Sequence, residues 1–176
     1  MGSHFLTLHV GSPAGISELM ARDSPRAIDQ IPDSETRRFA EKIMKGEYTR
    51  DPHTWEHPEG HLFIRAFQAL SELSSRSRVT LEIYDDDERT PELWNFIWSD
   101  WEPAGMFALP LSPYGAPAVT YKDRGAVVKY LNQFKELRDA GGYDSSLVSP
   151  TDLDSLISVL ETTAAQGPGV FVFIEY

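Results

Sequence analysis

Four consecutive acids, Asp85-Asp86-Asp87-Glu88, are the residues whose types and spacing most directly suggest chemistry. They follow residues 79–84, whose alternation of apolar and polar side chains is typical of a strand. Paired carboxylates at the end of a strand can hold Mg²⁺ for phosphoryl or glycosyl transfer, with Asp85 and Asp87 as the ligands. The alternative is a charged turn whose carboxylates favour the N-terminus of the next helix.

Three histidines spaced by four, His53, His57 and His61, form a second candidate. On one continuous helix this spacing would place three imidazoles on one face, as a transition-metal site requires. Pro58 and Gly60 break such a helix. We therefore predict a polar loop over residues 47–60, with His61 in the first turn of the next helix, and no bound metal or other cofactor.

The acidic run resembles the DxDx(T/V) motif of haloacid-dehalogenase-type enzymes, but it departs from that motif. Glu88 and Arg89 separate Asp87 from Thr90, at least one strand precedes the run, and the lysine and final acidic motifs of that family are not evident. The sequence also contains no GxSxG, HExxH, GxxxxGK[ST] or GxGxxG motif. No complete catalytic motif is therefore found, and we predict no catalytic residue.

The net charge of -11 is concentrated in one window, residues 82–102, which holds eight acidic residues and one basic residue. The same window holds three of the four tryptophans, Trp94, Trp98 and Trp101. These three can be core residues of a helix. Alternatively, part of the stripe is exposed, and aromatic anchors within a charged rim are typical of an interaction site. The predicted partner-binding residues are Asp85, Asp86, Asp87, Glu88, Glu92, Trp94, Trp98 and Trp101.

The composition excludes several classes of protein. The chain has no cysteine, which excludes disulfides, thiolate metal sites and cysteine nucleophiles and is typical of a cytoplasmic protein. Its acidity argues against nucleic-acid binding, because phosphates repel such a surface. The first ten residues lack the features of a signal peptide, and no apolar stretch is long enough to cross a membrane. We expect a cytoplasmic protein with no nucleic-acid or membrane partner.

The periodicity of apolar residues predicts the elements of one domain spanning residues 1–176. The apolar run at residues 170–174 predicts a central strand buried on both faces. Residues 23–32 contain two prolines and indicate an irregular link or a short helix. The other strands are expected near residues 5–10, 79–84, 106–111 and 118–121, and the helices near residues 13–20, 34–45, 61–74, 91–101, 124–140 and 150–166. This irregular alternation predicts an α+β fold, with a single mixed sheet of about 4–5 strands and about 5–6 helices packed on it.

The C-terminal third resembles the YfbM-like proteins, small bacterial proteins that carry a domain of unknown function. The matching residues are Leu156-Ile157, Leu160, Ala164 and Gly167, followed by VFVFIEY, with weaker support from Pro117 to Tyr121. The resemblance implies a bacterial cytosolic α+β fold. It supplies no catalytic residues.

These observations predict a non-enzymatic, cytoplasmic protein-binding module, of the kind in which an immunity or antitoxin protein occludes a basic toxin. Negative charge would steer the basic partner to the surface, and the tryptophans would anchor it. The first alternative is a small metal-dependent hydrolase or transferase that uses Asp85 and Asp87. The second is an uncharacterised homo-oligomeric domain, in which the tryptophan face forms a homodimer.

Overall fold

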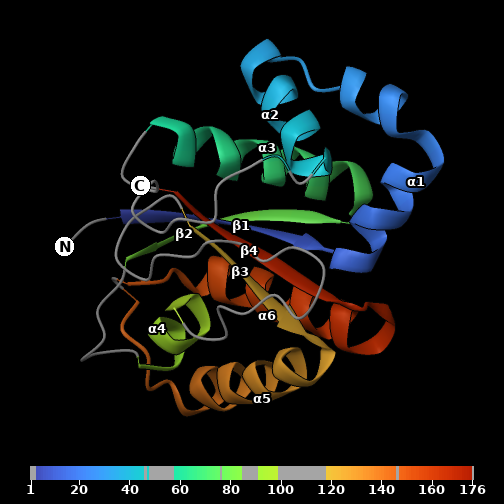
Figure 1. The fold of residues 1–176 in the computed structure, drawn as a ribbon. Coiled ribbons are helices and arrows are strands. Elements are labelled where there is room, and N and C mark those ends of the chain that lie inside the picture. The colour runs from blue at the N-terminus through green and yellow to red at the C-terminus, as the bar shows by residue number, and fades with distance from the viewer. Residues whose placement is uncertain are drawn as a thin grey trace.

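The computed structural model describes residues 3–45, 47, 58–75, 77–84, 91–98, 118–145 and 147–175. Within them, one four-stranded sheet lies between two layers of helices (Figure 1). This arrangement confirms the predicted α+β class. The elements are β1 (Ser3–Val10), α1 (Pro13–Asp29), α2 (Ser34–Lys45), α3 (Pro58–Ser74), β2 (Arg78–Tyr84), α4 (Pro91–Trp98), β3 (Ala118–Asp123), α5 (Arg124–Ala140), α6 (Pro150–Gln166) and β4 (Gly169–Glu175).

The described strands lie in the order β2-β1-β4-β3, and every neighbouring pair is antiparallel. The prediction of a mixed sheet is wrong in this respect. Two helices, α5 and α6, connect β3 to β4. Because the chain reverses its direction on entering α5, α6 and β4 in turn, β4 runs antiparallel to β3. At the other edge, α3 ends beside the end of β1, where the Val10 N–H donates to the Ser77 carbonyl. The chain can then enter β2 only in the direction opposite to β1.

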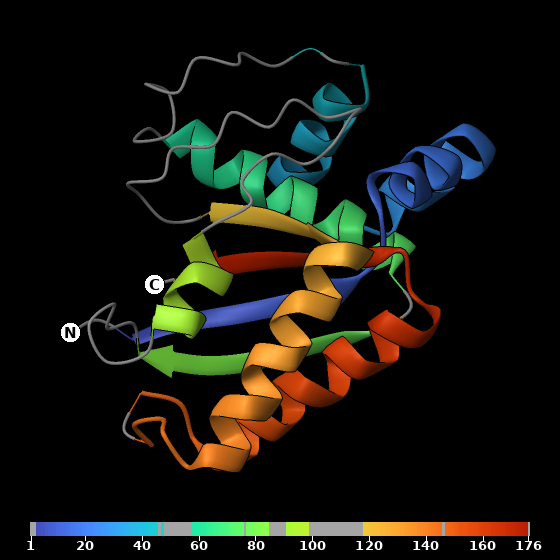
Figure 2. The ribbon, with the colours of Figure 1, turned by 90° about the horizontal axis from the view of Figure 1, so that it is seen from below.

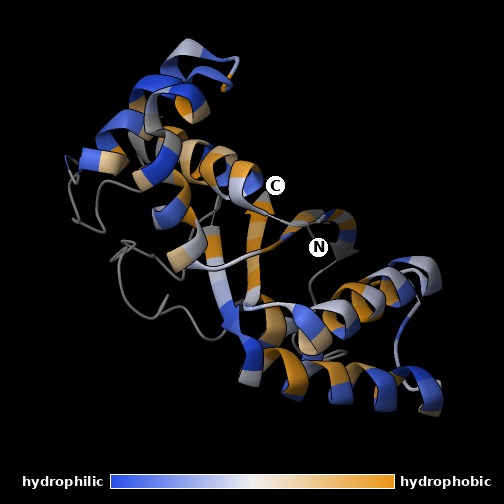
Figure 3. Ribbon diagram, turned by 90° about the vertical axis from the view of Figure 1, so that its right-hand side faces the viewer, coloured by the Kyte–Doolittle hydropathy of each residue, from blue (hydrophilic) through white to orange (hydrophobic). Residues whose placement is uncertain are grey.

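Strand β4 lies between β1 and β3, as its apolar sequence predicts. All five residues from Val170 to Ile174 are fully buried, and Figure 3 shows the strand as hydrophobic along its length. Its odd and even residues enter different cores, because successive side chains point to opposite faces of a sheet. β4 is therefore the strand on which both helical layers pack.

The two layers of helices lie on opposite faces of the sheet (Figure 1), and each layer has its own core. The upper layer consists of α1, α2 and α3, and its core contains Phe67, Phe171 and Phe173. The lower layer consists of α4, α5 and α6, and its core contains the aliphatic side chains of β1, β2 and β4. Figure 2, viewed from below, shows α2 and α3 displaced toward the β3 edge. The upper face of β2 is therefore left uncovered by the described helices, and Arg78, Thr80 and Glu82 are exposed.

The helix boundaries follow local capping, with two departures from the predicted limits. Ser12 and Ser149 accept backbone N–H bonds as N-caps, and each is followed by proline in the first turn. Helix α1 continues through Pro25 to Asp29, because the buried Ile28 packs in the upper core and outweighs the lost hydrogen bond. Helix α3 begins at Pro58, three residues earlier than predicted, since proline is tolerated in a first turn.

Candidate functional site

Helix α4 positions the part of the acidic, tryptophan-rich window that the structure describes. Its inner face consists of Leu93, Phe96 and Ile97, which are all buried in the lower core. The Phe96 ring meets the ring of Tyr130 on α5 edge-to-face, with centroids 5.3 Å apart. The Tyr130 hydroxyl donates a hydrogen bond of 3.2 Å to the carbonyl of Asn95. These contacts fix α4 against α5.

Trp94 and Glu92 are the two predicted binding residues whose side chains the structure describes, and both are half-buried. Two residues apart on a helix, they point to different sides, so α4 does not bring them together on one face. Glu92 lies in the first turn, where the helix dipole favours a carboxylate. The backbone of Trp98 belongs to α4, but its side chain lies outside the description, as do Asp85, Asp86, Asp87, Glu88 and Trp101.

Lys122 on β3 is a buried polar residue that the sequence analysis does not identify. It is fully buried beneath α4, and its Nζ lies 5.7 Å from the Phe96 ring centroid and 5.5 Å from that of Tyr130. Thr120 lies on the same face of β3, and its buried Oγ1 has no hydrogen-bond partner among the described residues. Alternation of Val119 and Tyr121 with Thr120 and Lys122 predicts one solvated face. Helices cover both faces instead.

His9 on β1 is a second buried polar residue, on the opposite face of the sheet. Its Nδ1 lies 3.0 Å from the Ser71 hydroxyl, and its ring centroid is 5.0 Å from that of Phe173. Burial lowers the pKa of His9 to about 4, Glu72 opposes this shift, and Arg78 adds to it. The imidazole is therefore neutral at pH 7. Within the described part of the chain, its Nε2 has no hydrogen-bond partner.

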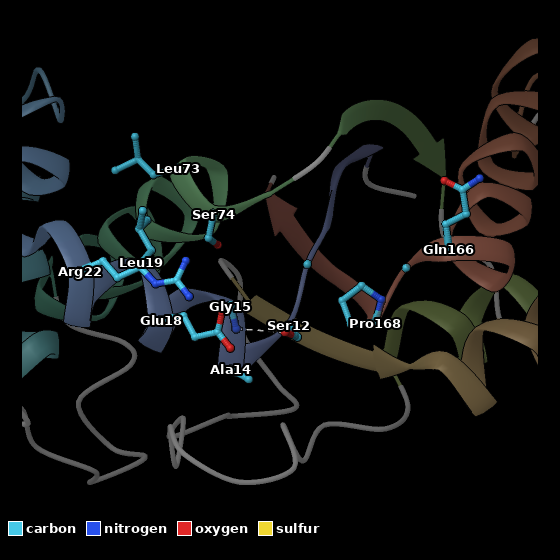
Figure 4. Close-up of a pocket in the computed structure, with 12 residues that line it drawn as sticks. Ser12, Ala14, Gly15, Glu18, Leu19, Arg22, Leu73, Ser74, Gln166 and Pro168 are labelled. Carbon is cyan, nitrogen blue, oxygen red and sulfur yellow. Dashed lines mark hydrogen bonds between the residues drawn. The ribbon is translucent and has the colours of Figure 1, made fainter.

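A pocket of about 690 Å³ lies where β1 leads into α1, and Figure 4 shows the residues that line it. Glu18 and Arg22 project from α1, and Leu73 and Ser74 come from the end of α3. The volume lies within the range of small-molecule sites. The Arg22 guanidinium would attract an anionic ligand, but the Glu18 carboxylate in the same pocket would repel that ligand. The lining therefore does not select one class of ligand.

The predicted metal candidates lie outside the description, which omits residues 48–57 and the side chain of His61. Among the side chains that are described, no group of three or more histidines and acids could hold a metal ion. No helix in this part of the chain is long and apolar enough to cross a membrane.

Comparison with protein-family models, with curated proteins and with solved structures finds no match for this chain. The resemblance to the YfbM-like proteins therefore stays a prediction.

Proposed function

We propose that this protein is a non-enzymatic binding module that captures a basic protein partner through α4 and the acidic segments on either side of it. The observation that carries the proposal is the difference in burial between the apolar residues of α4. Leu93, Phe96 and Ile97 fill the core, while the Trp94 side chain is left half-buried at the surface. A large aromatic ring at the surface of a rigidly held helix is typical of an interaction anchor.

The charge of the surrounding sequence defines the partner. Residues 82–102 carry a net charge of -7, whereas the other 155 residues carry only -4. Such a local concentration accelerates association with a positively charged surface and repels nucleic acid. An immunity- or antitoxin-like protein that occludes the basic active site of a toxin would have this distribution of charge. The cytoplasm is the compartment we propose for it.

The test is affinity capture from a bacterial lysate, followed by measurement of affinity for the captured protein at increasing salt. Replacing Asp85, Asp86 and Asp87 together by Lys should abolish binding and its salt dependence. Trp94→Ala should weaken binding about thirtyfold or more, because anchors of this type contribute about 2 kcal/mol or more. The melting temperature of each variant, measured separately, distinguishes loss of the surface from loss of the fold.

The matched control replaces three exposed acids elsewhere, Glu35, Glu41 and Glu136, by Lys. It changes the net charge by the same amount as the test variant. If both triple variants weaken binding equally, overall charge rather than this surface determines binding, and the proposal is wrong. It is also wrong if the captured protein is acidic or if binding does not depend on salt.

The second function to be tested is metal-dependent hydrolysis or group transfer by Asp85 and Asp87. A metal that binds the native state must raise the melting temperature as its free concentration rises. A scan with Mg²⁺, Mn²⁺ and Zn²⁺ should therefore show no shift if the binding-module proposal is correct. A shift that Asp85→Asn removes would favour the enzyme.

A further inference from the structure

Strand β2 forms one edge of the sheet and, among the described residues, pairs only with β1. The hydrogen bond of 3.0 Å from the Val10 N–H to the Ser77 carbonyl fixes which residues of β2 face β1. In an antiparallel pair, alternate residues bond to one neighbour, and the residues between them point their N–H and C=O groups to the other side. The outward-pointing residues of β2 are Arg78, Thr80 and Glu82.

The side chains of these three residues lie on the upper face of β2, which the described helices leave uncovered, and all three are exposed. Thr80 lies across from Thr7, with 3.3 Å between their hydroxyls. Arg78 forms an ion pair of 2.7 Å with Glu72 at the end of α3. The edge therefore presents, in order along the strand, a guanidinium whose Nη1 is bound to Glu72, a central hydroxyl and a carboxylate. A guanidinium has five N–H donors, so Arg78 can bind a second carboxylate as well.

The lower side of the same edge has room for another strand. A hollow of about 400 Å³ lies between Val79 and α6, and its other lining residues are mostly small and polar. The carboxylate of Asp154 in this hollow lies 3.6 Å from the Arg138 guanidinium, so it is paired within the chain. An added strand would not meet an uncompensated charge there.

We infer that two copies of this chain associate by pairing β2 with β2 in antiparallel orientation, about a two-fold axis at Thr80. This register places Arg78 of each copy opposite the partner's Glu82, so both cross-strand pairs join opposite charges. An axis at Arg78 or at Glu82 would instead place like charges opposite each other, which is unfavourable. An axis at Val79 or at Leu81 would place Arg78 or Glu82 opposite the partner's Thr80. Of these five axes, the one at Thr80 is therefore the one that joins Arg78 to Glu82 in both cross-strand pairs of an isologous dimer.

Light scattering coupled to size exclusion should show a dimer whose fraction rises with concentration. Thr80→Pro removes an N–H that points away from β1, so the strand tolerates it, and the variant should be monomeric. The proposal is overturned if the wild type is monomeric up to its solubility limit. It is also overturned if Thr80→Pro folds and still dimerises, because the dimer would then use another surface, such as that of Trp94.

The register is tested by exchanging charges. Arg78→Glu and Glu82→Arg should each weaken the dimer about tenfold or more, and the double variant should restore it to within about twofold. Because Arg78→Glu also breaks the ion pair with Glu72, the control is Glu72→Gln, which should leave the dissociation constant unchanged. Failure of the double variant to restore dimerisation would overturn this register.

The absence of natural cysteines allows a direct measurement of proximity. Residues on the two-fold axis of such a pair have Cα atoms about 5.5 Å apart, within the range of a disulfide. Thr80→Cys should therefore cross-link into a covalent dimer on mild oxidation. Val128→Cys, at an exposed position on α5, should not. Equal cross-linking of the two variants would indicate random collision and contradict the proposal.

Discussion

The two faces of the sheet are covered in different ways. On the lower face, α6 packs along β2, so aliphatic side chains from the edge strand to the centre are buried. On the upper face, aromatic rings of β4 pack against Phe67 of α3, and the cover ends before it reaches β2. Among the described strands, β2 is an edge because it comes last in the strand order, and the displaced upper layer also leaves the upper face of this edge strand exposed.

Each face of the sheet also buries a titratable residue, His9 on the upper face and Lys122 on the lower face. His9 lies under α3 and is kept neutral by burial. Lys122 lies under α4, with its Nζ 5.7 Å from the Phe96 ring centroid and 5.5 Å from that of Tyr130. The stability of the upper core therefore depends on pH through the His9 imidazole. The stability of the lower core depends instead on the packing of the long Lys122 side chain.

The largest effect is expected from Lys122→Ala. The change removes a fully buried stem beside Phe96 and Tyr130, and deleting a buried side chain of this length destabilises a fold by about 2–5 kcal/mol. Lys129 provides a matched control, because its Nζ lies 4.9 Å from the Tyr130 ring centroid but the residue is exposed. Lys129→Ala should cost less than about 1 kcal/mol in urea denaturation. Equal losses would show that burial of Lys122 contributes nothing.

The next effect depends on pH and belongs to the upper layer. The pKa of His9 lies below its ordinary value of 6.5, at about 4, so in this window the unfolded chain binds a proton that the folded chain does not. Stability is therefore lost as the pH falls from about 6.5 to 4, by about 3 kcal/mol from this residue. His9→Phe should remove that part of the pH dependence. Ser71→Ala, which keeps the imidazole, should retain it.

The smallest effect is expected from the exposed ion pairs of the two layers. Glu72 pairs with Arg78 in the upper layer, and Lys135 on α5 pairs with Glu161 on α6 in the lower layer. Exposed pairs contribute about 0–1 kcal/mol because water screens them. Glu72→Gln and Glu161→Gln should therefore lower the free energy of unfolding by similar small amounts, and less in high salt. A loss above about 2 kcal/mol in either variant would contradict this.

The sequence predicts local structure better than it predicts the surroundings of individual residues. Serine followed by proline correctly locates the starts of α1 and α6, and the apolar run correctly places β4 at the centre. Strand direction could not be predicted, since it depends on where the helices between two strands end relative to the sheet. Lys122 was missed because alternation predicts a covered face and a solvated face, and here a helix covers each.

The tryptophan stripe illustrates the same limit. Helix α4 is apolar on most of its circumference, so periodicity alone cannot decide which face enters the core. The structure buries Phe96 beside Leu93 and Ile97 and leaves Trp94 half-buried. The burial of Trp94 in the predicted surface could not be predicted from the sequence, because it depends on where α5 packs against α4.

The pairing of β1 with β4 has a consequence for how the chain acquires its fold. Phe5 lies opposite Glu175, so the two strands at the middle of the sheet come from opposite ends of the described sequence. During synthesis, β1 can pair with β2 on one side, but it must wait for nearly all of the remaining residues before β4, its neighbour on the other side, emerges. Such distant pairing slows folding, and until it forms, β1 has an unpaired edge of the kind that causes aggregation. Growth temperature and chaperone supply should therefore affect the soluble yield of this protein more strongly than its final stability suggests.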